Sequence, residues 1–242
     1  LSLSLATVLV LVAVHRQPAR HLLGLSQRFA WPQFWRAALA FLIVGLLGLV
    51  VTVLSTPETV ALVPGLAQRL PWLALALPVI FCQSFAEDYL FKGYLLRTWG
   101  AVVPVPWLIA PAVAAVFTAG HAVNNDVATD LVFNLICFFA GEVVLMAIYL
   151  RAGNLAAATG LHWMNNVWSM CILATLPGQS GALAIATYTD PDLIAGRSHL
   201  ADPTAWAEVV VMYGLLWVLL MWRRSALRLQ PDRAAAGLHD RR

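Results

Sequence analysis

Long apolar segments dominate this sequence and restrict what it can fold into. Runs of about twenty apolar residues recur along the 242-residue chain, and each is long enough to cross a hydrocarbon core of roughly 30 Å. Hydrophobic residues make up 61% of the chain and charged residues only 11%, whereas a soluble domain carries about 25% charge. Because so little polar surface is available, we expect an all-α, polytopic bundle of transmembrane helices.

About seven spans are expected, all of them helical, in a single integral membrane domain covering residues 1–242. The first span looks partial, so a further span could be missing or could lie in the interface at the N-terminal end. The motifs described below define a core at about 70–176, and residues 231–242 have the composition of a polar cytoplasmic tail. The expected spans are 1–14, 37–55, 71–97, 106–123, 128–150, 154–176 and 205–222.

The basic residues are segregated to one side of these spans. Thirteen of the fifteen lie at or near one face of the expected bundle, and only Arg69 and Arg197 fall on the other. Because basic loops remain in the cytoplasm, this asymmetry predicts a cytoplasmic C-terminus. The basic residues therefore orient the protein in membrane lipid, and nucleic acid is not expected as a partner. A composition rich in Ala, Leu and Arg favours a bacterial inner membrane.

Strongly polar residues interrupt the expected spans at only a few positions. One acid or base at the centre of a membrane helix costs about 2.5–3.5 kcal/mol on insertion scales, so such residues usually face a bundle interior and mark a functional site. At 1.5 Å per residue, Glu87, His121 and His162 lie at similar depths on three helices, which independent core histidines would have no reason to do. The polar positions are Glu87, Asp88, Lys92, His121, Asn134, Glu142, His162, Asn165 and Asn166.

Two of the acids have structural interpretations. Asp88 and Lys92 are four residues apart, so they lie on one face of their helix and can neutralise each other. Such a pair would leave Glu87 without a local partner. Glu142 either lines the same cavity as Glu87 or, in its protonated form, donates a hydrogen bond between helices.

The remaining residues combine a carboxylate, two imidazoles and a carboxamide, which is a set suited to hydrolysis. His162 and Asn166 are four residues apart and project from one helix face. Phe117 and His121 have the same spacing, so the phenyl ring can pack against the imidazole. A carboxylate can take a proton from water, and an imidazole can share that proton or bind a metal. The other imidazole and the amide can donate hydrogen bonds to an oxyanion.

Three short motifs resemble those of the CPBP family, which contains CAAX prenyl proteases and bacteriocin-processing intramembrane proteases. EDYLFKGYLL is similar to the EExxxR motif, FTAGH to FxxxH and HWMNN to HxxxN, in the family's order over about residues 70–170. The resemblance implies an intramembrane endopeptidase acting on a membrane-associated or hydrophobic peptide or protein. Glu87 and His121 would activate water. His162 and Asn166 would hold an oxyanion or a metal.

Two residues depart from that family's pattern. Asp88 stands where a second Glu is expected and Lys92 where an Arg is expected; both keep the charge, but Lys lacks the planar fork of Arg. With Phe117, they are expected to support the site. The departures leave a second interpretation open, in which the protein keeps the fold as a non-proteolytic scaffold, immunity protein or chaperone.

The same residue types suit two further roles. A divalent metal such as zinc could be bound by Glu87, His121 and His162, or these residues could act without a metal, as in a glutamate-type protease. Carboxylates and imidazoles inside a membrane also form relays in proton- or metal-coupled transporters. No internal repeat of the transporter kind is visible in the sequence, and ion flux in liposomes would distinguish a transporter from a protease.

Overall fold

A computed structural model describes residues 13, 16, 18–123, 128–176 and 182–230. The expected first span at 1–14 lies outside these residues except for position 13, and the expected tail at 231–242 lies outside them completely. Helices dominate what is described, which confirms the all-α class.

Four helical segments of the described chain are long and apolar enough to cross a membrane. A further helix, α5 (Pro106–His121), is apolar but has only 16 residues. The expected total of about seven spans is therefore not confirmed. The four segments are α2 (Trp31–Ser55), the continuous segment of α3 (Leu66–Asp88), η3 (Tyr89–Leu95) and α4 (Leu96–Val102), then α6 (Leu131–Ala152) and α9 (Pro203–Met221).

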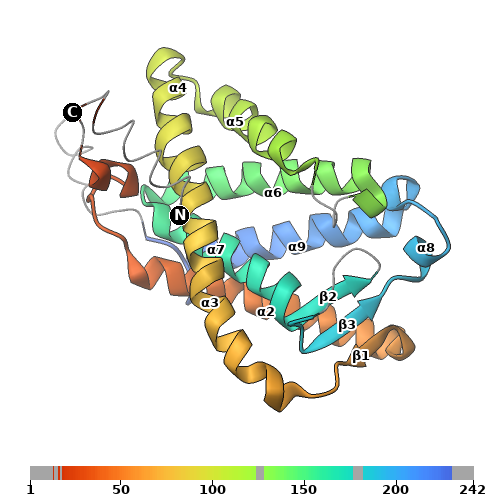
Figure 1. The fold of residues 1–242 in the computed structure, drawn as a ribbon. Helices are drawn as coiled ribbons and strands as arrows, with labels where there is room; N and C mark the ends of the chain where they lie inside the picture. Colours follow the sequence, from red (N-terminus) through yellow and green to blue (C-terminus); the bar gives the residue numbers. More distant parts are fainter. Residues whose placement is uncertain (1–12, 14–15, 17, 124–127, 177–181, 231–242) are drawn as a thin grey trace.

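The short helix α7 (Leu155–Val167) forms the centre of the bundle and packs against α2, α3 and α6 (Figure 1). Nearly all of its residues are buried. Its first turns are built from small residues, which let neighbouring helix backbones approach closely. A Cβ atom at Gly160 would lie 2.2 Å from the Phe34 carbonyl oxygen of α2. This close packing carries the HWMNN residues into the interior.

Local sequence signals set the beginning of α7. Helix α6 ends at Ala152, and the next residue, Gly153, has a φ of +67° in the left-handed region that glycine adopts without strain. The buried Asn154 then caps α7, because its Oδ1 accepts a hydrogen bond from the Ala156 N–H at 2.9 Å. The same side chain accepts from the Ala30 N–H at 3.3 Å and donates to the Arg28 carbonyl at 2.7 Å. The segment before α2 is thereby fixed to the α6–α7 turn.

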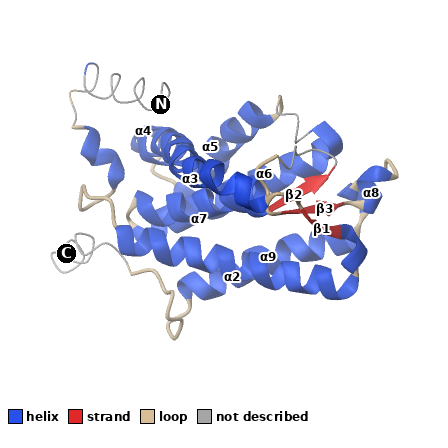
Figure 2. Ribbon diagram, turned by 60° about the horizontal axis from the view of Figure 1, so that its bottom comes forward, coloured by secondary structure: helices blue, strands red, loops and turns tan. Residues whose placement is uncertain are grey.

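Three short strands form a small sheet at one end of the bundle, beside α8 (Pro191–Ile194) (Figures 1 and 2). The strand order is β1-β3-β2, with β1 antiparallel and β2 parallel to β3. The strands are β1 (Val60–Leu62), β2 (Leu173–Leu176) and β3 (Ala186–Thr189).

The prediction that residues 154–176 are helical throughout is wrong at their C-terminal end. After α7, the π-helical segment η5 (Trp168–Ile172) leads directly into β2. A short apolar run is compatible with either a helix or a buried strand, and pairing with β3 decides the outcome here.

Candidate active site

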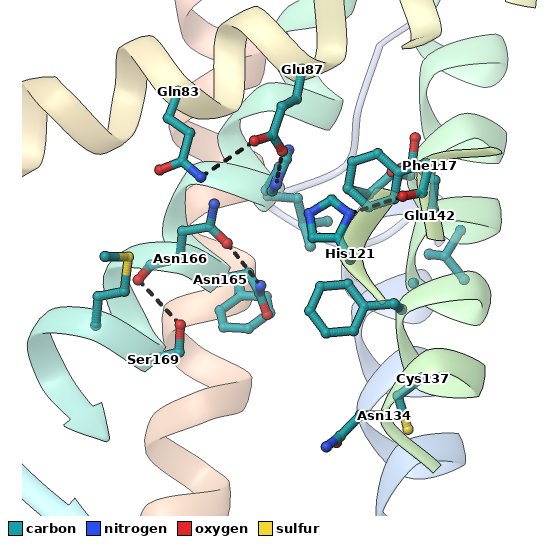
Figure 3. Close-up of a pocket in the computed structure, with 18 of the residues that line it drawn as sticks. Gln83, Glu87, Phe117, His121, Asn134, Cys137, Glu142, Asn165, Asn166 and Ser169 are labelled. Atoms are coloured by element: carbon teal, nitrogen blue, oxygen red, sulfur yellow. Dashed lines mark hydrogen bonds and ion pairs between the residues drawn. The ribbon is translucent and has the colours of Figure 1, made fainter. Parts of the chain in front are cut away.

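A cavity of about 870 Å³ lies among the helices and contains all four candidate catalytic residues. Glu87, His121, His162 and Asn166 line it together with apolar side chains, and Figure 3 shows the labelled residues facing one space. The volume is within the range of roughly 300–1,000 Å³ that is usual for ligand sites. The lining continues to Ala174 in β2, so the cavity extends toward the sheet end of the molecule.

Irregular helix geometry accompanies two of the motifs. Glu87 is the second-last residue of α3, and the π-helical η3 begins two residues later. His162 and Asn166 lie on α7, which continues into the π-helical η5. His121 is the last residue of α5. Single π-helical turns within α-helices frequently occur at functional sites.

Glu87 has two polar neighbours, so the prediction that it lacks a local partner is wrong. Its Oε1 accepts a hydrogen bond from Gln83 Nε2 at 3.3 Å, one helical turn earlier. Its Oε2 lies 3.6 Å from His162 Nε2, which is longer than a good direct hydrogen bond. The sequence could have predicted the first of these contacts, because Gln83 is four residues before Glu87 and therefore lies on the same helix face.

Asp88 contacts His162 and thereby sets the direction of its ring. Asp88 Oδ1 lies 3.0 Å from His162 Nδ1, and the Asp88 side chain is completely buried. A carboxylate accepts hydrogen bonds, so Nδ1 carries the proton and the opposite nitrogen, Nε2, faces Glu87. Asp88 is therefore more than a brace within its own helix.

Lys92 joins Asp88 to Glu142 of α6. Its Nζ lies 2.7 Å from Asp88 Oδ1 and 2.7 Å from each Glu142 oxygen, which confirms the predicted Asp88–Lys92 pair and adds a third member. Glu142 lines the cavity, which confirms the first of its two interpretations, and the position of the ammonium between its oxygens favours a carboxylate that accepts hydrogen bonds. A compact ammonium with three donors can serve carboxylates on two helices without the planar fork of Arg.

His121 is clamped by two aromatic rings. Its Nδ1 lies 2.9 Å from the Phe117 carbonyl oxygen. Because a carbonyl only accepts, Nδ1 carries a proton, and Nε2 is the nitrogen that can accept a hydrogen bond when the ring is neutral. The Phe117 ring centroid is 4.3 Å from that of the imidazole, as the spacing predicted, and Phe138 packs at 5.0 Å.

The amide of Asn166 is oriented by Asn165, one of the polar positions noted in the sequence, and by Ser84, which was not predicted to belong to the site. Its Nδ2 donates to Ser84 Oγ at 3.2 Å, and its Oδ1 accepts from Asn165 Nδ2 at 3.3 Å. Ser84 is completely buried and lies three residues before Glu87. That helical spacing is the signal that could have identified Ser84.

Among the described residues, those that line the cavity include no three His, Cys, Asp or Glu whose ligand atoms all lie within 4.8 Å of one another. Among the residues that the structure describes, one set of three His, Cys, Asp or Glu residues has ligand atoms that all lie within 4.8 Å of one another. None of its members lines this cavity. The three candidate ligands named from the sequence, Glu87, His121 and His162, are not that set. The set is Asp190, Asp192 and His199.

Comparison with known protein families points to the same segment of the chain. Residues 69–168 match the family model described as type II CAAX prenyl endopeptidase Rce1-like. This match supports membership of the CPBP family. The matched residues contain all three motifs, and proteolysis is the general activity of this family.

The CPBP-like segment also has a distant curated relative. Over 100 residues the chain is 25% identical to an uncharacterized protein, YyaK of Bacillus subtilis (strain 168), and the match covers 41% of this chain and 33% of that protein. This chain thus spans about a third of the relative's length, and the relative's name states no activity. No solved structure matches the chain.

Proposed function

We propose that this protein is an intramembrane endopeptidase of the CPBP type, which hydrolyses a peptide bond in a membrane-associated or hydrophobic peptide. One observation carries the proposal: the Glu87 carboxylate faces the Nε2 atom of His162 in a cavity, and Asp88 holds the other nitrogen of that ring. A carboxylate beside an oriented imidazole is the arrangement expected for proton transfer during hydrolysis.

In the proposed first step, Glu87 and His121 activate one water molecule. The Glu87 carboxylate accepts a proton from the water while His121 Nε2, an acceptor in the neutral ring, orients it. The water oxygen forms a bond to the carbonyl carbon of the substrate, and the carbonyl electron pair moves onto its oxygen. Gln83 holds Glu87 through Oε1 and leaves Oε2 on the side of His162.

His162 and Asn166 would stabilise the oxyanion that results. Asn166 has a second Nδ2–H besides the one given to Ser84, and protonated His162 carries a hydrogen on Nε2. Both are donors of the kind that stabilise a tetrahedral intermediate. Collapse of the intermediate then breaks the C–N bond, and the leaving amine takes the proton from Glu87. The net change is the addition of water across one peptide bond.

The experiment is cleavage of a library of hydrophobic peptides by the purified protein in nanodiscs, with new termini identified by mass spectrometry. Glu87→Gln keeps the shape but removes the base, and should lower turnover by about 10²–10⁴-fold. Glu208→Gln makes the same change at an exposed residue of α9 and should leave turnover unchanged.

Equal turnover in Glu87→Gln and the native protein would refute the assignment. If no peptide is cut and Glu87→Gln retains its cellular phenotype, the non-proteolytic scaffold is favoured.

A further inference from the structure

The geometry points to a second, separate site: a zinc-binding centre formed by Asp190, Asp192 and His199 at the sheet end of the molecule. One ligand atom from each of the three residues lies within 4.8 Å of the others. His199 Nε2 and Asp190 Oδ2 are 3.2 Å apart. Two ligands bound tetrahedrally to one zinc at about 2.0–2.1 Å lie about 3.3 Å from each other, so these two atoms already have the spacing that a shared cation requires.

A fourth residue orients the histidine as in known zinc sites. Asp130 Oδ2 lies 3.2 Å from His199 Nδ1 and accepts the His199 backbone N–H at 2.7 Å, and Asp130 Oδ1 accepts from Ser198 Oγ at 2.7 Å. In a zinc-bound centre Asp130 would accept the Nδ1 proton, which would leave the lone pair of Nε2 for the metal on the side of Asp190. A carboxylate that orients a metal-bound imidazole in this way is a common outer partner of zinc ligands.

The charges around this imidazole are unbalanced. Asp130 and Asp190 are each only 6% exposed, and burial of a carboxylate is costly unless a positive charge accompanies it. Arg197 pairs with Asp192 from the solvent side, through Nε at 3.0 Å and also through Nη2. With His199 neutral, as a zinc ligand must be, three carboxylates against one guanidinium would leave an excess of negative charge that a divalent cation would neutralise.

The ligand types favour zinc over the alkaline-earth cations. An imidazole with two carboxylates suits zinc, whereas calcium and magnesium prefer oxygen ligands alone. Asp190 Oδ1 caps α8 by accepting the Asp192 and Leu193 N–H groups at 2.9 and 3.2 Å, so Oδ2 is the oxygen aimed at His199. Three protein ligands leave a fourth position for water.

This centre would fasten the segment before α9 to the beginning of α6. Asp130 immediately precedes α6, and the His199 ring packs on Phe133 of that helix at a centroid distance of 5.4 Å. Asn134, the next residue, lines the cavity. Zinc would thus stabilise the rim of the cavity from outside, with no contact to the candidate catalytic residues. The inference does not depend on peptidase activity.

The rival explanation is a protonated His199 that bridges the two aspartates without a metal. The test uses the full chain in nanodiscs, stripped with a chelator and titrated with ZnCl₂, with bound zinc counted by elemental analysis and affinity measured by calorimetry. The measurement is made in the Glu87→Gln background, so that zinc in the main cavity does not enter the count. We expect about one zinc per chain and a melting temperature that rises with zinc concentration.

Variants assign the site. His199→Gln and Asp190→Asn should weaken zinc binding at least tenfold, and Asp130→Asn by about 10–100-fold. Asp192→Asn changes a half-buried ligand whose side chain is 36% exposed, so it stays informative if the more buried variants fail to fold. The control is Glu58→Gln, which neutralises an exposed acid of η2 (Pro57–Thr59) and should bind zinc normally. Absence of zinc binding, or equal affinity in Asp192→Asn and the control, would overturn the inference.

Discussion

The buried ion cluster makes Lys92 the residue whose removal should most damage the fold. Lys92→Met keeps a long side chain but leaves two carboxylates, Asp88 and Glu142, without their ammonium. Both acids are at most 1% exposed, and each lies 2.7 Å from Lys92 Nζ. The loss of stability therefore comes from two buried carboxylates that no longer have a cation beside them, rather than from lost packing.

The size of the effect follows from that geometry. Removal of one partner from a buried pair costs about 3–5 kcal/mol, which for a chain of this length lowers the melting temperature by roughly 6–20 °C. Glu142→Gln should cost less, about 1–3 kcal/mol, because the amide oxygen still accepts from Lys92. The double variant should lose less stability than the sum of the two single variants, because Glu142→Gln removes one of the two carboxylates that Lys92→Met leaves without a cation.

The assay is thermal unfolding of the purified variants in one detergent, followed by circular dichroism. Arg197→Met is the matched control: it also removes a cation from an ion pair, but its side chain is 64% exposed, and surface pairs contribute about 0–1 kcal/mol. A Lys92→Met protein that melts within about 2 °C of the native protein would refute the argument that Lys92 neutralises both acids.

Three further changes test other parts of the structure. Asp88→Asn removes the negative charge beside His162 and lets an amide N–H face Nδ1, which favours the wrong tautomer of the ring, so kcat should fall by about 10²–10⁴-fold with a small change in KM. Steady-state kinetics that match the native protein would contradict a positioning role. Gly160→Ala should destabilise the protein because its Cβ would meet the Phe34 carbonyl oxygen. The control Gly48→Ala, whose Cβ would have nothing within 4 Å, should be neutral or stabilising. Equal melting temperatures of the two variants would argue against the close approach of α2 and α7. Asn154→Ala removes the cap of α7 and the two hydrogen bonds to the backbone before α2, so it should lower the free energy of unfolding by at least about 1–2 kcal/mol. Amide hydrogen exchange in residues 28–30 should become faster, and unchanged exchange rates there would contradict this role.

Most helices were predictable because their signal is local. The end of α2 at Ser55 was predicted from the apolar run, but its start at Trp31 lies six residues before the predicted one. Pro32 in the first turn favours a helix start there, and Arg36 and Gln33 interrupted the apolar pattern. Their side chains donate to backbone carbonyls near the C-terminal end of the described chain, a contact that no local pattern reveals.

The residues of the candidate site were predictable for a different reason. Ionisable side chains are rare inside membrane helices, so Glu87 and His162 stand out in the sequence, and their motif spacing adds a second signal. Their partners were harder to find. Glu142 is fifty residues from Lys92 in sequence, and the pairing depends on how α6 lies against η3. The strands, too, depend on pairing between distant segments rather than on composition.

The proposal that Glu87 directs water onto a peptide bond is tested most directly by oxygen-isotope labelling. The protein is mixed in H₂¹⁸O with a peptide that it cleaves, at less than one peptide per chain, and the new carboxyl terminus is analysed by mass spectrometry. We expect one ¹⁸O atom in that carboxylate during the first turnover, and cleavage that is slower by about 10²–10⁴-fold with Glu87→Gln. A product that carries only ¹⁶O, with ¹⁸O appearing in the Glu87 carboxylate, would show that Glu87 attacks the substrate itself and would contradict the mechanism.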